Sequence, residues 1–407
     1  MSSFFGLTLP DGVDLRLRAG APVLPLDGLP GASGCEPGRQ VKLVDPHGDL
    51  VACGIADPEN GVIQVMALEA VRGFDAKFFA ERLTRSLALR RALGFTAESA
   101  YRLVNAEGDE LPGFSVDRFG EYAVVCAPSR PLLPYARLLA EATLAATAAL
   151  ATPATIDEPR LRGAVIKVRG KDPQDRSHKD EIIGATPPEK YVVHELGVPY
   201  EVHLLGSLNV GLFPDMREQR RHIGRFVTGR RVLNTFAYTG ALSIAAARAG
   251  ADTVTSVDLS SGVLAWAREN FRLSGFAAGD ARFRFEVSDV KRFMQKEVER
   301  GSLYDTILLD PPTVSAARAS QWSMKRDYPQ LLALATKLLP PSGGILWVSA
   351  NTRRGPSVLR HIDEGIRLSG RRGALLEVGG LPPDFPTPPG WPESRYLEIC
   401  QVFVTSG

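Results

Sequence analysis

The hydrophobic pattern in the second half of the chain alternates between short apolar runs and longer amphipathic segments. The short runs predict buried strands at 231–234, 253–257, 283–287, 305–309 and 344–348. The longer segments have apolar residues at helical spacing and predict helices at 241–249, 261–273 and 326–339. Repeated strand-helix units predict an α/β fold with a parallel sheet and helices on both faces. Because ligands bind at the carboxyl ends of such strands, the residues that follow each strand are the candidates for chemistry.

The first half of the chain has a different pattern. Up to about residue 70, short alternating apolar runs lie between Pro, Gly and Asp turns, which predicts a small β-rich domain. Apolar residues at helical spacing from 78 to 93, with arginines between them, predict a basic amphipathic helix. Strand-like runs at 122–125 and 164–168 and a helix at 134–150 predict a mixed α/β region. We therefore expect three domains, at 1–70, 71–190 and 191–407.

Composition narrows the classes of protein that fit this organisation. The chain is 44% hydrophobic and 23% charged, which is ordinary for a globular protein. Its 407 residues are too many for a single hydrophobic core. No apolar run reaches the roughly 20 residues of a membrane-spanning helix, and the N-terminus lacks the pattern of a signal peptide. We expect a cytoplasmic protein that does not act at a membrane. Since the net charge is only +2, any contact with nucleic acid must come from local basic clusters.

The cysteines give a separate constraint. Cys35, Cys53, Cys126 and Cys400 lie far apart and form no CxxC pair. This spacing argues against a zinc site and against a disulfide framework, so we expect no metal. Four reduced, mostly buried thiols are the expected state.

The loop after the first of the alternating strands is the candidate for cofactor binding. It contains one glycine, Gly240, whereas a dinucleotide site needs three glycines in a GxGxxG pattern. The second and third strands end in acidic residues that suit ribose hydroxyls and an adenine amine. Each feature alone also fits an ordinary turn or a helix cap, but together they favour a nucleoside-type cofactor. The candidate residues are Asn234, Phe236, Tyr238, Thr239, Gly240, Asp258, Leu259, Ser260, Asp289 and Val290.

The fourth and fifth strands end in candidate substrate-binding residues. Two prolines follow Asp310, and their fixed backbone gives a rigid rim against which a planar base could stack. Asp310 could accept a hydrogen bond from a base or from the ammonium group of a cofactor; the alternative is a turn that only ends a buried strand. Polar and basic residues after the fifth strand could read a base edge and hold phosphates. The candidate residues are Asp310, Pro311, Pro312, Asn351, Arg353 and Arg354.

Two further segments are candidates for phosphate contact. A polar loop carries four basic residues, Arg169, Lys171, Arg176 and Lys179. The segment before the first strand carries Asp215 and four arginines at helical spacing, Arg217, Arg220, Arg221 and Arg225. These arginines could anchor a cofactor carboxylate or RNA phosphates. A solvated basic surface is the alternative for both segments.

Longer stretches of the chain resemble bacterial large-subunit ribosomal RNA methyltransferases with a class I Rossmann-like fold. The stretches are LNTFAYTGALSIAAARAGADTVTSVDLSSG, GLFPDMREQRRHIG, LLDPPTVS and WVSANTRR. Upstream, YRLVNAEGDELPGFSVDRFG resembles the central RNA-binding domain of the cytosine-C5 branch, and the first 70 residues resemble its PUA domain. The resemblance implies S-adenosylmethionine (SAM) as cofactor and ribosomal RNA as partner. It also implies that Asp215, Arg217, the loop 236–240, Asp258 and Asp289 contact SAM, with residues 310–312 beside the target base.

One departure concerns the target atom. Cytosine C5 becomes nucleophilic only after a thiolate adds to C6, and the C5 branch carries a cysteine after the fifth strand in a Ser-Cys-Ser pattern. Here the corresponding residues are Ser349, Ala350 and Asn351. The LDPPT and S-x-N-x-R patterns resemble the guanine-N7 branch, whose target nitrogen has its own lone pair and needs orientation rather than a covalent catalyst. The sequence therefore predicts methylation of ribosomal RNA, with guanine N7 the favoured atom.

Several alternatives stay open at this point. A distant thiol such as Cys400 could fold into the site and permit C5 chemistry. The chain could be a non-catalytic RNA-binding or ribosome-assembly factor that keeps a methyltransferase fold. A protein or a secondary metabolite could be the substrate, although neither requires the N-terminal domains. The sequence also leaves open whether the protein forms a homodimer.

Overall fold

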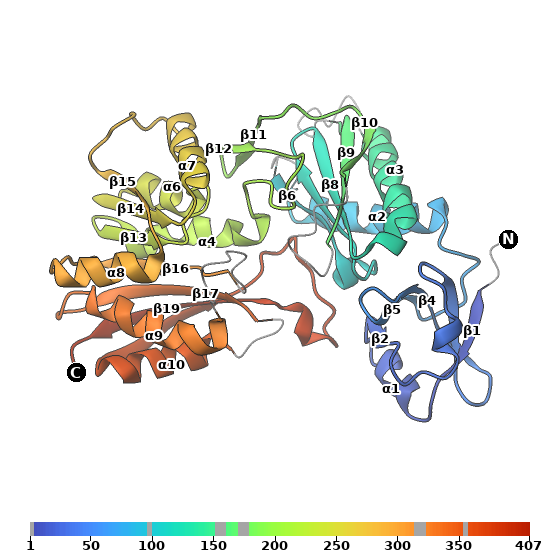
Figure 1. Ribbon diagram of the computed structural model, residues 1–407. Coiled ribbons are helices and arrows are strands. Elements are labelled where there is room, and N and C mark those ends of the chain that lie inside the picture. The colour runs from blue at the N-terminus through green and yellow to red at the C-terminus, as the bar shows by residue number, and fades with distance from the viewer. Residues whose placement is uncertain (1–3, 96–99, 151–159, 170–178, 313–322, 353–356) are drawn as a thin grey trace. The chain divides into compact units, whose positions relative to one another are not determined.

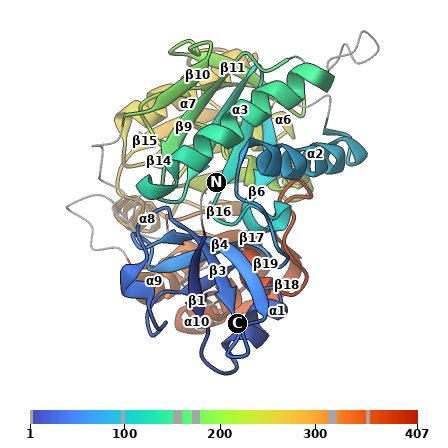
Figure 2. The same cartoon turned by 90° about the vertical axis from the view of Figure 1, so that its right-hand side faces the viewer.

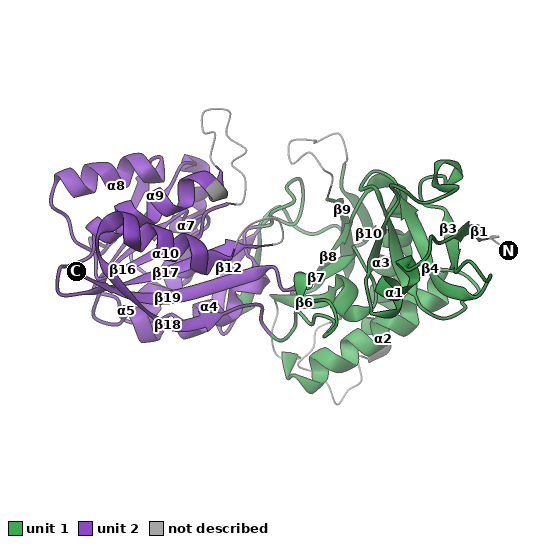
Figure 3. Cartoon of the chain, turned by 90° about the horizontal axis from the view of Figure 1, so that it is seen from below, with its two compact units in different colours: residues 1–194, 203–210, 383–394 green, residues 195–202, 211–382, 395–407 purple. Residues whose placement is uncertain are grey.

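The computed structural model describes residues 4–95, 100–150, 160–169, 179–312, 323–352 and 357–407. The chain forms two compact units (Figure 3). Unit 1 consists of residues 1–194, 203–210 and 383–394, and unit 2 consists of residues 195–202, 211–382 and 395–407. The chain first passes from unit 1 to unit 2 through the strands β11 (Tyr191–Glu195) and β12 (Val198–Val202). The domain boundaries expected at residues 70 and 190 remain predictions.

The first sheet of unit 1 contains five strands in the order β1-β3-β4-β5-β2. Alternate residues point into its core: Val41 and Leu43 are fully buried, and Lys42 between them is exposed. The elements are β1 (Phe5–Thr8), α1 (Val13–Arg18), β2 (Val23–Pro25), β3 (Gln40–Val44), β4 (Leu50–Asp57) and β5 (Val62–Ala67). The N-terminal region is thus β-rich, as its pattern predicts.

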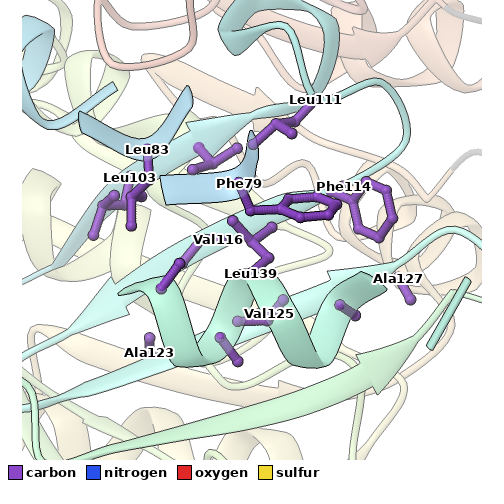
Figure 4. Close-up of a cluster of buried hydrophobic side chains, with 14 of the residues drawn as sticks. Phe79, Leu83, Leu103, Leu111, Phe114, Val116, Ala123, Val125, Ala127 and Leu139 are labelled. Atoms are coloured by element: carbon purple, nitrogen blue, oxygen red, sulfur yellow. The ribbon is translucent and has the colours of Figure 1, made fainter. Parts of the chain in front are cut away.

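The second sheet of unit 1 has the order β10-β9-β8-β7-β6 and packs against two long helices. The elements are α2 (Ala76–Ala92), β6 (Ala100–Asn105), β7 (Ser115–Phe119), β8 (Tyr122–Ala127), α3 (Leu133–Leu150), β9 (Gly163–Val168) and β10 (Glu181–Gly184). Figure 4 shows Phe79 and Leu83 of α2 in one cluster with Leu139 of α3 and with Leu103 and Val125 of the sheet. All five side chains are fully buried, so this cluster is the core that joins helices and sheet.

Helix α2 presents fewer basic groups to solvent than its sequence suggests. Arg82 and Arg90 are only 9% and 1% exposed, and they form ion pairs with Glu110 and Asp109. Arg90 also donates a hydrogen bond of 2.7 Å to the backbone carbonyl of Asp384. The predicted basic face is therefore wrong for these two arginines, because both are buried and form ion pairs inside unit 1.

A segment close to the C-terminus, residues 383–394, belongs to unit 1. The Asp384 carboxylate accepts a hydrogen bond from the Arg102 backbone N–H at 2.8 Å, and the Asn105 side-chain amide donates to the Pro386 carbonyl at 2.8 Å. Arg102 and Asn105 lie in β6, the last strand of its sheet. The segment therefore satisfies polar groups along an edge strand that would otherwise be open.

Unit 2 contains one seven-stranded sheet in the order β15-β14-β13-β16-β17-β19-β18. The five strands from β13 to β17 are parallel, whereas β19 is antiparallel to both β17 and β18. The strands are β13 (Arg231–Thr235), β14 (Thr253–Asp258), β15 (Phe283–Val287), β16 (Thr306–Leu309), β17 (Gly344–Asn351), β18 (Arg372–Gly379) and β19 (Leu397–Thr405). The predicted α/β Rossmann-like fold is confirmed, and the switch point of the sheet lies between β13 and β16.

Helices cover both faces of this sheet (Figure 1 and Figure 2). The helices are α4 (Arg217–His222), α5 (Gly224–Val227), α6 (Ala241–Arg248), α7 (Ser261–Leu273), α8 (Val290–Glu299), α9 (Met324–Lys337) and α10 (Val358–Ser369). Leu331, Leu332 and Ala335 of α9 are buried at helical spacing in a core with α8 and α10. Among the described residues, no helix is long and apolar enough to cross a membrane.

Candidate active site

The loop that follows β13 has an unusual backbone at the switch point of the sheet. Phe236 and Tyr238 have φ angles of 56° and 48°, and Gly240 has a φ of 80°. Positive φ is uncommon for residues other than glycine, and such strained residues concentrate at functional sites. The Tyr238 N–H donates to one oxygen of Asp258 at 3.0 Å, and the Ser260 N–H donates to the other at 3.0 Å. One carboxylate at the end of β14 therefore fixes the loop after β13.

Gly240 is the residue of this loop that cannot be replaced without strain. It precedes α6 in the left-handed conformation, and an added β-carbon would lie 3.0 Å from the Cβ of Ala267 in α7. The glycine thus allows α6 and α7 to approach each other closely while the backbone turns into α6. The sequence prediction singled out this glycine for ligand approach; its contact with α7 is a second reason for the residue.

Two predicted cofactor residues, Asn234 and Thr239, have side chains engaged inside the protein. Both are 1% exposed. Asn234 donates to the Ser243 hydroxyl of α6 at 2.8 Å, and the Thr239 hydroxyl donates to the Gly211 carbonyl at 2.5 Å. Asn270 of α7 donates to the Thr239 carbonyl at 3.0 Å. These side chains support the loop from within the fold.

Three aromatic rings pack beside the loop, and only Tyr238 was among the sequence candidates. The ring centroid of Tyr238 lies 5.3 Å from that of Phe213 and 6.3 Å from that of Trp266. Burial raises the pKa of Tyr238 to about 12, so its phenol is protonated at neutral pH. Phe213 is 42% exposed. Gly211 leaves room for the Trp266 ring, because an added β-carbon at Gly211 would lie 2.2 Å from the indole.

The ends of β14 and β15 offer apolar surface next to acidic groups. Leu259 and Val287 are 56% and 53% exposed. Asp289 caps α8 by accepting the Arg292 N–H at 2.9 Å, so its carboxylate has the structural role that was one of the alternatives. Val290 is 5% exposed and belongs to the core beneath α8. The side chain of Val290 is therefore directed into the core, whereas that of Val287 is exposed; a role of Val290 in cofactor binding stays a prediction.

The Asp310 carboxylate is held at the end of β16 by a short polar network. The Ser349 hydroxyl at the end of β17 donates to Asp310, and the Tyr328 hydroxyl donates to the Ser349 carbonyl at 2.8 Å. Ser349 and Tyr328 are fully buried. Burial raises the pKa of Asp310 to about 6, Asp215 adds to this effect, and the Ser349 hydrogen bond opposes it. Pro311 is buried and Pro312 is exposed, so the rim after Asp310 has one accessible proline.

Asp215 and the arginines around it occupy different environments. The Tyr396 hydroxyl donates to the Asp215 carboxylate at 2.9 Å. Arg217 is 1% exposed. Arg220 is 7% exposed and makes hydrogen bonds of 2.5 and 2.7 Å with the two carboxylate oxygens of Glu195. Because both charges of this pair are buried and matched, Arg220 is part of the interior of unit 2.

The predicted basic face of α4 and α5 does not form as one surface. Arg221 and Arg225 have side chains that are 64% and 68% exposed, whereas Arg217 and Arg220 are buried. Arg225 also pairs with Glu377 at 3.3 Å. The predicted helical spacing is correct, but the side chain of Arg220 pairs with the buried carboxylate of Glu195 in β11. The predicted role in phosphate contact is therefore wrong for Arg220.

A protein family described as S-adenosylmethionine-dependent methyltransferase matches residues 150–389 of this chain. The chain belongs to this family. Ribosomal RNA large subunit methyltransferase I of Tolumonas auensis is 32% identical to this methyltransferase over 89% of the chain and 90% of the relative. The protein of the same name from Photobacterium profundum is 28% identical over 97% and 98%. SAM is therefore the cofactor, as the sequence predicted.

Two solved structures have the same fold as this methyltransferase. A protein from Streptococcus mutans described as SAM-dependent has a TM-score of 0.84 at 22% identity, over 98% of this chain and 100% of that one. SMU.776, described as a methyltransferase in complex with SAH, has a TM-score of 0.85 at 22% identity, with the same coverage. The strand-end residues of this methyltransferase suit such a cofactor, since they combine a carboxylate for ribose hydroxyls with exposed apolar side chains for an adenine ring.

The cysteines of the methyltransferase are free and buried, which confirms the sequence prediction. Cys400 lies in β19 opposite Val348 and is fully buried. Burial raises its pKa to about 12, so its thiol is protonated at neutral pH. Burial also raises the pKa of Cys35, Cys53 and Cys126. None of the four is an activated thiolate.

The remaining predicted RNA-binding residues divide into two groups. Arg169, Lys179 and Asn351 are exposed, Asn351 at the last position of β17. Four of the predicted residues lie outside the described part of the chain, namely Lys171, Arg176, Arg353 and Arg354.

Proposed function

We propose that this methyltransferase transfers a methyl group from SAM to a base of large-subunit ribosomal RNA, and that the acceptor atom is guanine N7. The RNA substrate is supported by the names of the relatives, of which the chain spans 90% and 98%. The acceptor atom rests on one observation, the absence of an activated thiol. Where a cytosine-C5 enzyme carries the cysteine of its Ser-Cys-Ser pattern, this chain has Ala350, and the preceding residue, Ser349, donates a hydrogen bond to Asp310.

The proposed SAM site lies at the carboxyl ends of β13, β14 and β15. Asp258 accepts from the ribose hydroxyls with the lone pairs that its two backbone N–H partners leave available. Leu259 and Val287 cover the adenine ring, and the free oxygen of Asp289 accepts from the adenine amine. Phe236, Tyr238 and Gly240 surround the methionine end, together with Asp215 and Arg217. The backbone at Thr239, after β13, and at Ser260, after β14, shapes the site, and the side chain of Asn234 supports the first of these loops.

The reaction at N7 requires no covalent step with the protein. SAM supplies an electrophilic methyl group on a sulfonium. The N7 lone pair forms the new N–C bond, the C–S bond breaks, and its electron pair stays on sulfur. No proton leaves N7, and the purine ring acquires a positive charge. The protein therefore has to orient the base and stabilise the developing charge.

Asp310 has the chemistry to do both. An ionised carboxylate at the end of β16 accepts hydrogen bonds from the N–H groups on the Watson–Crick edge of guanine and favours the cationic product. Ser349 keeps one oxygen of Asp310 in place. Pro312 gives the exposed part of the rim, and Asn351 contacts the base or its neighbour.

We propose that the two N-terminal domains bind the RNA substrate. A PUA-like domain at 1–70 and a central domain at 71–190 bind RNA, and six basic residues of the chain neutralise phosphates. These residues are Arg169, Lys171, Arg176, Lys179, Arg353 and Arg354. The affinity for RNA then falls strongly with salt, because binding releases counterions.

Cysteine variants test this proposal. Each of the four Cys→Ala variants should retain methyl transfer, and the wild-type enzyme should form no stable covalent complex with RNA that carries 5-fluorocytidine. Binding of SAM by each variant, measured by calorimetry, separates loss of chemistry from loss of fold. A variant that binds SAM normally but no longer methylates RNA would contradict the proposal.

A further inference from the structure

Phe213 is an exposed aromatic residue next to the proposed cofactor site. It is 42% exposed, and among the Phe, Tyr and Trp residues that the structure describes it is the one that is neither buried nor partly buried. Single exposed apolar side chains are ordinary on protein surfaces, so exposure alone assigns no role. Unpaired bases of RNA, however, are bound by stacking on aromatic side chains. The position of Phe213 in the fold therefore decides what its ring can contact.

The segment that carries Phe213 crosses the carboxyl ends of the central strands of the sheet. At its start, Gly211 lies against the indole ring of Trp266 in α7, the helix that follows β14. At its end, Asp215 accepts a hydrogen bond of 2.9 Å from the hydroxyl of Tyr396, the residue before β19. The first residue of β19 lies opposite the last residue of β17. The segment thus passes over β13 and β16, which lie between β14 and β17 in the sheet.

Phe213 is fixed through its backbone and by a second ring. The Arg220 guanidinium donates a hydrogen bond of 2.8 Å to the Phe213 carbonyl, and both carboxylate oxygens of Glu195 fix that guanidinium. The next residue, Pro214, is buried and has a restricted backbone. The Phe213 ring packs against that of Tyr238, with centroids 5.3 Å apart and an angle of 39° between the ring planes. The exposed part of the ring is therefore held in place before a ligand binds, which lowers the entropy cost of stacking.

We propose that the ring of Phe213 stacks on the guanine that receives the methyl group, a role that rests on the proposed function. The last residues of β13 and β16, Thr235 and Leu309, lie opposite each other in the sheet, so the loops after the two strands start side by side. The first loop carries Tyr238, against which Phe213 packs, and the second starts with Asp310. A guanine bound to Asp310 by its Watson–Crick edge can therefore present its face to Phe213.

The electrostatics of Asp310 agree with this placement. Burial raises the pKa of Asp310, and the Ser349 hydrogen bond lowers it. Smaller effects come from Asp215, which raises this pKa, and from Arg220, which lowers it. Asp215 lies two residues after Phe213, and Arg220 holds the Phe213 carbonyl, so the neighbours of the ring act on the carboxylate that binds the base.

An aromatic face also suits the charge that this reaction creates. The N7–C bond forms as the C–S bond breaks, the electron pair stays on sulfur, and the positive charge passes from the sulfonium to the purine. The face of a phenyl ring is the negative part of its quadrupole and attracts a cation. The stack is therefore stronger with the methylated base than with the neutral one, so part of its free energy is gained only as the methyl group moves.

Variants at Phe213 test the proposal in single-turnover transfer from tritiated SAM to ribosomal RNA of cells that lack the gene, with SAM and RNA both saturating. Phe213→Leu should lower the rate about ten- to a hundredfold, because it keeps an apolar side chain but removes the stack. Phe213→Tyr should keep most of the rate, since it restores a ring. Leu368→Ala, at a 55% exposed position of α10, is the matched control and should react as wild type. The SAM affinity of Phe213→Leu, measured by calorimetry, should stay near the wild-type value, which also shows that the variant folds.

A wild-type rate for Phe213→Leu, or a rate for Phe213→Tyr as low as that of Phe213→Leu, would overturn the proposal. A loss of SAM affinity that accounts for the lost rate would also overturn it, because the ring would then cover the cofactor. A loss confined to RNA affinity would place the ring against a neighbouring nucleotide instead. The labelled nucleoside of the wild-type enzyme tests the proposed function separately. A product other than 7-methylguanosine would contradict the acceptor atom, while the variants would still decide the role of the ring, since every base has a face that can stack. A wild-type enzyme that labels no RNA would overturn both.

Discussion

The hydrogen bond between Ser349 and Asp310 makes a prediction about the pH dependence of the reaction. The ionised carboxylate is the stronger acceptor of hydrogen bonds from the base and carries the charge that favours the cationic product, so kcat/KM should rise with pH through the pKa of Asp310, about 6. Ser349→Ala removes the hydroxyl that favours the ionised form. A hydrogen bond to a charged group contributes about 1.5–3 kcal/mol, so the midpoint should move upward by about one to two pH units.

The assay is single-turnover transfer from tritiated SAM to RNA, measured for wild type and Ser349→Ala across the pH range of both midpoints. Ser288→Ala is the matched control, because Ser288 directly follows β15 of the same sheet but its hydroxyl donates to the backbone carbonyl of Asp289. Asp310→Asn should give a low rate without this pH dependence. A midpoint for Ser349→Ala that equals or lies below that of wild type would refute the role assigned to the hydroxyl.

The raised pKa of Asp310 means that the folded protein binds this proton more tightly than the unfolded chain. The free energy of unfolding should therefore fall by about 3 kcal/mol as the pH rises from about 4 to 6. Urea titrations should show that Asp310→Asn removes this part of the pH dependence. Glu195→Ala should lower the free energy of unfolding by about 3–5 kcal/mol, because Arg220 would remain buried without its partner. Arg221→Ala, at an exposed position, should change it by less than about 0.5 kcal/mol. Gly240→Ala should cost about 1–2 kcal/mol, because the backbone is left-handed and the added carbon meets α7 at 3.0 Å, and calorimetry should show weaker SAM binding. The four cysteines should react slowly with a thiol reagent at neutral pH until the chain unfolds, and a rapidly labelled thiol would contradict their assigned environments.

The parallel part of the fold was predictable because its signals are local. Each strand from β13 to β17 is a short apolar run, and the helix predicted at 261–273 has the bounds of α7. The antiparallel strands β18 and β19 were not predicted. β18 is exposed along most of its length, so it lacks the hydrophobic pattern that marks a buried strand.

Site residues were predictable where the requirement lies in the residue itself. They were not predictable where contact with another element determines whether the side chain is buried. Gly240 and Asp258 follow from strand-end position and backbone requirements. The burial of Arg220 depends on Glu195, which lies on another element, and the sequence gives no sign of that pairing. Val290 and Val287 are both apolar residues near the end of β15, and only the start of α8 determines which one is buried. Contacts between distant segments are the information that the local pattern lacks.

The most direct test of the proposed reaction is the identity of the methylated nucleoside. Purified protein should be incubated with tritiated SAM and ribosomal RNA from cells that lack the gene, and the digested RNA analysed by mass spectrometry. The account predicts label in 7-methylguanosine. Label in 5-methylcytidine would contradict it, since that product requires a thiolate that the four buried cysteines do not provide.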